Sequence, residues 1–453
     1  MQHWRRPYSA AAAALALAAV GGCRGGLGRQ PSQPTIRVET VPADTIPEAA
    51  VGDTAFPTMP GPARPAGSAG AMLRVALSNF LEAPLISATG RWRISELDGS
   101  PLASASAGEQ WTVVAVRGGV HAERQAGSNG ITAPGPLVVT PLECGALLSF
   151  NGRRYRGELL VYAASRGVLA VNRIAVEDYL RGVVPLEIGE RTAAERAAVE
   201  AQAVAARSYA YTHLGARGQR YDMLSTVEDQ VYGGVEAERP LTDVAVAATS
   251  GMVLRYGSRI ASAPYHSTCG GSTAEPGEIW NGESSAPYLR RVSDRIPGTQ
   301  RYYCDPSPRF TWTREMSGDA VTKALDRYLR GRGGSKGSVG RVRSVQVESR
   351  TPSGRVGVLV IDTDQGAQRL RGNEIRYALR GTGGDILNST YFSVETGGEG
   401  ESGGVATVTI RGSGYGHGVG MCQWGAIGRA RAGQDVRAIL RTYYPGTSVG
   451  TVD

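Results

Sequence analysis

The apolar residues follow one pattern before residue 175 and another after it. From Met72 to Ala175 they form short alternating or continuous runs separated by glycine. Such runs are typical of β-strands. Examples are 72–77, 111–116, 157–162 and 167–172. This part of the chain is therefore expected to be β-rich.

Helical patterns appear after residue 175. Thr192 and Glu195 have the spacing of a capping box, which predicts a helix running to about Leu214. Further helices are expected at 242–250, 317–330, 373–379, 422–432 and 436–443, and further strands at 252–256, 259–266, 342–349, 356–362 and 405–411. Strands and helices in blocks, without β-α-β alternation or an internal repeat, predict an α+β fold. Its β-rich N-terminal part would be 71–175, followed by a mixed helix and strand part at 176–453.

The first 23 residues have the features of a lipoprotein signal peptide. Arg5 and Arg6 precede an apolar stretch at 10–20, which is shorter than the about 20 residues that span a bilayer. Small residues then lead to Cys23, the expected site of lipidation. The alternative is an ordinary secretory signal in which Cys23 is incidental. Residues 24–70, rich in Pro, Gly and Ala, are expected to be a disordered tether.

The predicted export limits the partners that the net charge can indicate. The formal net charge is +8, and a basic balance can indicate nucleic acid. An exported protein facing the periplasm or cell wall rarely meets nucleic acid, so anionic cell wall is the expected partner and nucleic acid is not. Composition drift is an equally good explanation of the charge. The membrane would be contacted through the N-terminal lipid.

Four cysteines remain after Cys23. In an oxidising compartment a disulfide is plausible, and Cys269 with Cys304 is the preferred pair because both flank one loop-rich segment. Cys144 and Cys422 could pair or stay free. The spacing of the four is not that of a zinc ribbon.

Glu187 is the first candidate for chemistry. It follows an apolar stretch that runs into Pro185, and its neighbours on both sides are apolar. Desolvation there would raise its pKa, as a general acid for a glycosidic oxygen requires. The alternative is that a Glu near a helix start serves the helix dipole.

The predicted helix after Thr192 carries a second set of candidates. Gln202, Arg207 and Tyr209 are polar groups on a largely apolar surface. Arg207 could orient a carboxylate or a sugar substituent. A solvated Arg and a core Tyr are the alternative interpretation.

Two glycine-rich segments, 265–271 and 412–426, form the third set. Alternating glycines let the backbone approach a ligand and leave His417 little covered. A phosphate loop is excluded because the Gly-Lys-Ser/Thr ending is missing. A serine triad using Ser267 lacks a nucleophile elbow. Metal binding by His266, His417 and Cys269 or Cys422 fits no standard zinc spacing.

Six blocks in one order resemble the stage II sporulation protein D family, the SpoIID/LytB domain. They are Glu177–Pro185 followed by Glu187, Ala201–Tyr209, Gln230–Gly234, Tyr265–Thr268 with Gly270–Gly271, Pro287–Leu289, and Gly414–Met421 with Gln423–Ala426. The likeness covers roughly Met72 to the C-terminus, so 71–453 would be one SpoIID/LytB-like domain with 176–453 as its catalytic part. Each block alone is weak, but six in the same order are highly specific.

The resemblance implies a peptidoglycan lytic transglycosylase, or a non-catalytic module that enhances a wall amidase. Glu187 falls on the family's catalytic acid. It would protonate the oxygen between N-acetylmuramic acid and N-acetylglucosamine in strands stripped of stem peptides, and the 6-hydroxyl would then give a 1,6-anhydro end. No cofactor is expected. The expected substrate-binding residues are Gln202, Arg207, Tyr209, His266, Ser267, Tyr415, His417 and Gln423.

The sequence departs from the family pattern at three places. Leu186 and Cys422 stand where the family often has Ser. Some sporulation enzymes bind zinc through Cys and His just before Gln-Val-Tyr, but here Met223–Asp229 contains neither residue type. No metal is therefore expected at that place, and none is expected elsewhere.

Overall fold

The computed structural model describes residues 70–452, except 126, 128–129, 219, 281–285, 333–337 and 401–402. The predicted signal peptide, Cys23 and all of the 24–70 tether except Gly70 lie outside the described residues. Within those residues, no helix combines the length and the apolar character that crossing a bilayer demands.

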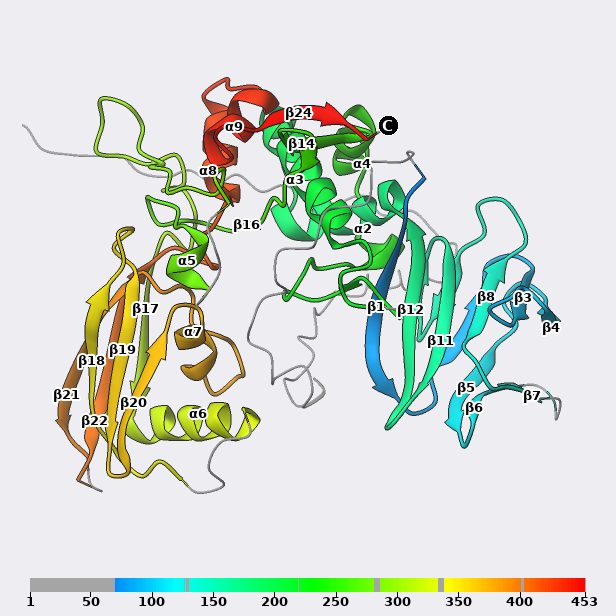
Figure 1. Ribbon diagram of the computed structural model, residues 1–453, viewed down its shortest axis with the longest axis horizontal. Helices are drawn as coiled ribbons and strands as arrows, with labels where there is room; N and C mark the ends of the chain where they lie inside the picture. Colours follow the sequence, from blue (N-terminus) through cyan, green and yellow to red (C-terminus); the bar gives the residue numbers. More distant parts are fainter. Residues whose placement is uncertain are drawn as a thin grey trace, which may run out of the picture. The chain divides into compact units, whose positions relative to one another are not determined.

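Two antiparallel-dominated sheets form the N-terminal part (Figure 1). One has the order β13 (Met223–Leu224), β1 (Met72–Leu81), β12 (Gly167–Ala175), β11 (Glu158–Ala164), β8 (Leu137–Pro141), β3 (Trp92–Ser95) and β4 (Pro101–Ala105). The other has the order β10 (Arg153–Tyr155), β9 (Leu148–Phe150), β2 (Leu85–Ala88), β5 (Trp111–Val116), β6 (Gly119–Arg124) and β7 (Gly130–Ala133). The expected β-rich part is confirmed.

Alternating side chains join these two sheets. In β5 the positions Trp111 and Val113 are buried, and the residues between them are not. Trp111 meets Trp92 of the other sheet edge to face, with ring centroids 6.3 Å apart. The sheets also contact each other through β11 and β12 against β5. Period-two burial on both sheets therefore produces one shared core.

A central helix organises the next part of the fold. It is α3 (Arg196–His213), entered through η2 (Ala193–Glu195), whose capping box between Thr192 and Glu195 is present as expected. Alanine is the commonest residue on its buried face, which lets neighbouring elements approach closely. The elements packed on it are α2 (Val176–Ile188), α4 (Pro240–Ala248), α8 (Gln423–Arg431), α9 (Val436–Tyr443) and β14 (Met252–Tyr256) (Figure 1).

Helix α2 was not predicted from the sequence. Gly182 and Pro185 argue against a helix, since proline removes a backbone donor and glycine costs conformational entropy. The fold requires Gly182, because a Cβ there would lie 2.6 Å from the ring of Tyr232. The buried face of α2, which includes Tyr179 and Val183, joins the main hydrophobic core. Tertiary packing thus outweighs the local propensity.

Short elements connect the remaining segments around α3. β14 pairs with β15 (Arg259–Ile260) and with β24 (Ser448–Thr451). β16 (Tyr265–His266) pairs in parallel with β23 (Met421–Cys422). The other short elements are η3 (Gly234–Ala237) and α5 (Pro276–Ile279). The pairing of β16 with β23 joins two glycine-rich segments that are far apart in sequence.

A second hydrophobic core lies within residues 316–410, which the sequence did not predict. One sheet has the order β17 (Thr311–Ser317), β22 (Val405–Ser413), β21 (Phe392–Glu399), and another has β18 (Val342–Arg350), β19 (Val356–Thr363), β20 (Gly366–Arg371). They pack with α6 (Gly318–Gly331) and α7 (Glu374–Ala378). The predicted β18–β19 hairpin and the helix after Ser317 are confirmed.

Candidate active site

Glu187 lies in the last turn of α2, two residues after the buried Pro185. The residue is partly exposed, yet protein surrounds its carboxyl group. The backbone N–H of Val231 donates a hydrogen bond of 2.8 Å to Oε1. Burial raises the pKa of Glu187 to about 7, against smaller lowering effects of the Val231 N–H and the Gln423 amide. The carboxyl group is thus partly protonated near neutral pH.

The position of Glu187 in the helix also argues against a role in stabilising a helix dipole. A glutamate at a helix start would be stabilised by the helix dipole, but Glu187 is at the C-terminal end, where negative charge is disfavoured. Glu187 stands ahead of the capped helix that begins after Thr192, as expected, but it also lies in α2, a helix that the sequence did not predict. Its unfavourable location is typical of a functional group rather than a stabilising one.

Three tyrosines lie close enough to Glu187 for its charge to act on them. Burial raises the pKa of Tyr179, Tyr209 and Tyr265 well above that of a free phenol, and the charge of Glu187 raises each further. Gln230 links two of them: Tyr179 Oη donates to Gln230 Oε1 at 3.1 Å, and Gln230 Nε2 donates to Tyr265 Oη at 2.9 Å. These phenols therefore stay neutral and can donate hydrogen bonds.

Sequence reasoning did not select Gln230, Tyr179 or Tyr265 as site residues. The signal was present, because all three lie inside the blocks that carry the family resemblance. A fully buried glutamine such as Gln230 needs partners for both ends of its amide, and the structure supplies them. This network holds the residue just before Val231, whose N–H meets Glu187.

Gln202 and Gln423 are brought together as neighbours of the site. Gln423, the first residue of α8, donates from Nε2 to Gln202 Oε1 on α3 at 3.3 Å, and both are buried. The Gln423 amide also lowers the pKa of Glu187, so the pair belongs to the surroundings of the acid. Gln202 Nε2 has no hydrogen-bond partner among the described residues. Substrate binding by the pair stays a prediction.

Arg207 does not face the site, contrary to the sequence-based expectation. It is fully buried and forms a two-pronged ion pair with Glu177, with contacts of 2.6 and 2.8 Å. It also donates to the carbonyl groups of Val246 and Met252. A guanidinium with these partners ties α2 to α3 and α4 and is not available to a substrate.

Tyr209 lies where a ligand could contact it. Its side chain is partly exposed, and its ring stacks on His213 with centroids 3.9 Å apart. Its hydroxyl reaches Asp229 at 3.4 Å. Asp229 in turn accepts from Arg217 and from the Leu224 N–H, so both of its oxygens are engaged.

His266 and His417 are neutral residues in and next to the glycine-rich segment 412–426. Burial lowers the pKa of His266 to about 3 and that of His417 well below the usual value. Val419 N–H donates to Nδ1 of His417, so Nε2 carries the proton and donates to the Tyr265 carbonyl at 2.8 Å. His417 also packs on Trp280, with ring centroids 5.2 Å apart.

Glycine is required where this loop crosses β16. At Gly420, with φ of +70°, a Cβ would lie 2.0 Å from the Pro264 carbonyl oxygen, and at Gly416, with φ of +113°, it would meet His266. The glycines therefore allow backbone to touch backbone. Their local role is to pack β23 against β16, which places Gln423 beside Glu187.

Ser267 and Tyr415 lie along the same seam. Ser267 is partly exposed, and its carbonyl accepts from the Trp424 N–H at 3.0 Å. The ring of Tyr415 lies under the guanidinium of Arg309, 4.0 Å from its centroid. Within the described ranges neither side chain hydrogen bonds to Glu187, so their part in binding stays a prediction.

The predicted Cys269–Cys304 disulfide is not formed in the structure. Both cysteines are free thiols, with sulfur atoms 3.5 Å apart. They lie side by side as expected, but Cys422 and Asp294 share the same buried place. The sequence predicted a pair and no metal site, whereas the described residues hold a group of four that could bind one ion. Cys144 is exposed.

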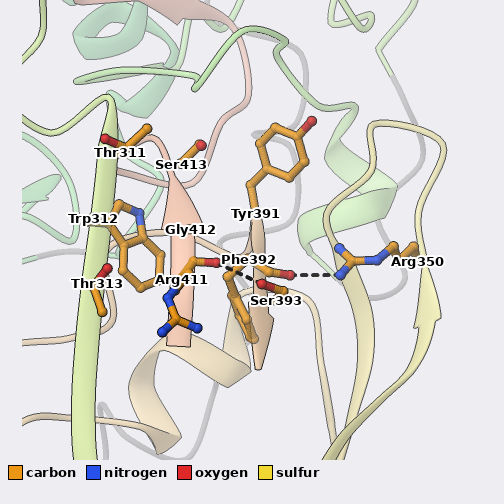
Figure 2. Close-up of a pocket in the computed structure, with 10 residues that line it drawn as sticks. All are labelled: Thr311, Trp312, Thr313, Arg350, Tyr391, Phe392, Ser393, Arg411, Gly412 and Ser413. Atoms are coloured by element: carbon orange, nitrogen blue, oxygen red, sulfur yellow. Dashed lines mark hydrogen bonds between the residues drawn. The ribbon is translucent and has the colours of Figure 1, made fainter. Parts of the chain in front are cut away.

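A shallow hollow lies elsewhere, on the sheet that contains β17, β21 and β22. Its volume is about 720 Å³. Figure 2 shows its lining, with Arg350 donating to the Phe392 carbonyl at 2.9 Å. The residues that line it are Thr311, Trp312, Thr313, Arg350, Tyr391, Phe392, Ser393, Arg411, Gly412 and Ser413. Neither Glu187 nor a predicted binding residue belongs to it.

Comparisons with known proteins agree with the arrangement around α2 and α3. The family described as "Stage II sporulation protein" matches residues 164–256, which contain Glu187 and Gln202. A domain of unknown function (DUF8618) matches 296–420, which include the second core. The first match thus covers the segment that carries the acid.

Three relatives cover most of the described chain. Stage II sporulation protein D of Bacillus amyloliquefaciens is 31% identical over 63% of this chain and 76% of its own length. An uncharacterized protein of Brachyspira hyodysenteriae is 30% identical over 66% of this chain and 73% of its own. The amidase enhancer of Bacillus subtilis is 31% identical over 60% of this chain, and the match covers 40% of that protein's own length.

The fold and site define a mixed α+β protein with a protonatable glutamate close to neutral polar side chains. The chain belongs to the stage II sporulation protein D family.

Proposed function

We propose that the chain is a peptidoglycan lytic transglycosylase and that Glu187 is its catalytic acid. The observation that carries the proposal is the Glu187 carboxyl group, which accepts from the Val231 N–H and whose pKa burial raises to about 7, on a residue that is partly exposed. A general acid works best when its pKa lies near the operating pH. The substrate class comes from the family, whose members include relatives named for sporulation and for amidase enhancement.

The reaction needs one carboxyl group in two roles. Glu187 gives its proton to the glycosidic oxygen as the bond from that oxygen to the anomeric carbon of N-acetylmuramic acid breaks. The 6-hydroxyl oxygen of the same sugar bonds to that carbon, and its proton returns to the Glu187 carboxylate. Atoms and charge balance without water. A second, water-activating carboxylate is not needed, in contrast to an inverting hydrolase.

The neighbours of Glu187 suit both halves of this cycle. The Val231 N–H and the Gln423 amide stabilise the carboxylate that forms after proton transfer, while burial favours the acid that starts it. The neutral phenol of Tyr265 accepts from Gln230 and still has its own proton to donate without adding charge, whereas the hydroxyls of Tyr179 and Tyr209 donate to Gln230 and Asp229. Asp229 is engaged by Arg217 and Leu224, so it is poorly placed to activate water.

The direct test is incubation of the purified chain with peptide-stripped glycan. Wild type should release products ending in 1,6-anhydromuramic acid, and Glu187→Gln should not. Glu190→Gln is the matched control, because Glu190 is exposed and pairs only loosely with Arg239 at 3.4 Å. Activity that survives in Glu187→Gln would overturn the assignment of the acid.

A second candidate is a non-catalytic wall-binding module that enhances an amidase. The name of the Bacillus subtilis relative and the net charge of +8 favour it. The two proposals separate in one assay, the rate of a wall amidase with wild type or Glu187→Gln added. Full stimulation by Glu187→Gln, together with no cleavage of glycan by wild type, would favour the module.

We also propose that the protein is exported and held at a membrane by a lipid on Cys23, facing periplasm or wall. The support is the sequence alone: a short apolar stretch, small residues and then Cys23. Radioactive palmitate should label the chain in cells, and Cys23→Ala should abolish the label. Equal labelling of the variant would refute the anchor.

A further inference from the structure

Three thiols and a carboxylate meet in the interior, away from Glu187. Cys269, Asp294, Cys304 and Cys422 each direct one ligand atom to a common place, and these atoms all lie within 4.8 Å of one another. All four residues are fully buried. Cys269 follows β16, Cys422 ends β23, and the other two belong to the segment between α5 and β17. Three distant segments thus converge on one point.

The spacing of these atoms suits a single small cation. The sulfur atoms of Cys269 and Cys304 are 3.5 Å apart, and Cys269 Sγ is 3.9 Å from Asp294 Oδ2. Ligand atoms arranged tetrahedrally around Zn²⁺ are about 3.5–3.8 Å apart, given the usual zinc–sulfur and zinc–oxygen bonds. Small movements of these side chains would bring all four ligand atoms to bonding distance of one ion.

Backbone amides point at the sulfur atoms. Cys422 Sγ accepts from the N–H groups of Cys269 at 3.2 Å and Gly425 at 3.3 Å. Cys269 Sγ accepts from the Gly271 N–H at 3.4 Å. Such donors stabilise thiolate rather than thiol, and thiolate is the form that binds metal.

Two hydrogen-bond donors outside the cluster fix the orientation of the Asp294 carboxylate. Tyr443 Oη donates to Asp294 Oδ1 at 2.7 Å, and Arg429 donates to the same oxygen at 3.1 Å. Oδ2 is left for the sulfur cluster. Outer partners that fix a ligand in this way are typical of metal sites.

The surrounding charge fits an occupied site. Three thiolates and one carboxylate carry four negative charges, and a 2+ ion leaves two of them uncompensated. Two buried guanidinium groups lie beside the cluster. Arg429 bonds to Asp294, and Arg355 donates to the Cys269 carbonyl at 3.0 Å. A Cys269–Cys304 disulfide would leave Cys422 and Asp294 Oδ2 without a role.

We propose that Cys269, Cys304, Cys422 and Asp294 bind one zinc ion in a closed, tetrahedral, structural site. Thiolate ligands select zinc among the common divalent ions, and four protein ligands leave no position for a substrate. The ion would pin β23 to β16 and to the 294–304 segment. Because Cys422 precedes Gln423, the same ion would fix the start of α8 next to the active site.

Metal analysis of the intact chain tests this inference. The full chain, exported by its host and purified without chelator or reductant, should contain one zinc per molecule. Cys304→Ser and Cys422→Ser should each lose most of the zinc. Cys144→Ser, which removes the exposed thiol, should keep it. Cobalt in place of zinc should give a thiolate-to-cobalt charge-transfer band that weakens in Cys422→Ser.

The wild-type chain gives a test that does not depend on the folding of variants. A strong chelator should release zinc and make the three cluster thiols reactive toward an alkylating reagent, as peptide mass analysis would reveal. A chain without zinc that contains a Cys269–Cys304 disulfide would overturn the proposal. So would zinc that stays bound in both cluster variants. These readouts do not involve glycan, so they stand apart from the proposed catalytic function.

Discussion

The backbone N–H of Val231 donates a hydrogen bond of 2.8 Å to Oε1 of Glu187, across 44 residues of sequence. The bond favours the carboxylate, whereas burial favours the acid and has the larger effect on the pKa. A group balanced in this way can both give and take back a proton.

The rate of glycan cleavage should depend on the protonation of Glu187. With a pKa of about 7, the carboxyl group is mostly protonated below pH 7 and loses its proton above it. Above the pKa the rate should therefore fall about tenfold per pH unit. Initial rates on peptide-stripped glycan between pH 5 and 9 would show this fall in rate. A rate that stays flat through pH 9 would contradict it.

The same shift predicts that Glu187 destabilises the folded chain at alkaline pH. Its pKa is near 4.5 when unfolded and about 7 when folded, so the folded state holds more protons between these values. Stability from this group is full below pH 4.5 and is lost as pH rises to 7. At pH 8 the free energy of unfolding of Glu187→Gln should therefore exceed that of wild type by about 3 kcal/mol.

Urea unfolding at pH 8 and at pH 4.5 measures that difference. The gain should be present at pH 8 and nearly absent at pH 4.5. Glu190→Gln serves as control, since an exposed ion pair contributes about 0–1 kcal/mol. An equal gain at both pH values would show that the burial of charge is not the cause.

In Gln423→Ala, the fall of the rate at alkaline pH should shift to a higher pH. The Gln423 amide lowers the pKa of Glu187, so its loss raises that pKa. The loss of positioning should also reduce the maximal rate about tenfold, or ~1.4 kcal/mol of transition-state stabilisation. Gln434→Ala is the matched control, because that amide bonds to Tyr303 instead. A lower rate with no such shift would mean that the residue acts only through structure.

Arg207 should matter for stability and not for substrate binding. Arg207 is fully buried while its partner Glu177 is 25% exposed, so removal of the arginine should cost about 3 kcal/mol, the low end for a buried ion pair. Arg207→Ala should lower the free energy of unfolding by that amount, and the milder Arg207→Lys should leave KM for glycan unchanged. A raised KM at unaltered stability would restore the sequence-based interpretation.

Local signals in the sequence were sufficient for much of the fold. The capping box of Thr192 and Glu195, the helix at 436–443 and the β18–β19 hairpin are confirmed. Each is specified by residues that are close in sequence. Helix α2 was missed because Gly182 and Pro185 oppose it locally, and its stability comes from packing against distant residues such as Tyr232.

The site was predictable in its main residue and less so in its surroundings. The apolar neighbours of Glu187 indicated a raised pKa, and burial does raise it. The partners of Arg207 and the meeting of Cys269 with Cys422 depend on long-range contacts, which spacing along the chain does not encode. The β16–β23 pairing creates both the cysteine cluster and the place of Gln423.

The most direct test of the central claim is the mass of the new glycan ends formed in H₂¹⁸O. Wild type and Glu190→Gln should give anhydro ends that contain no solvent oxygen, while Glu187→Gln should leave the strands uncut. Ends that are heavier by one labelled water would identify a hydrolase, and cleavage by Glu187→Gln would show that another group supplies the proton. Either result would contradict the proposed role of Glu187.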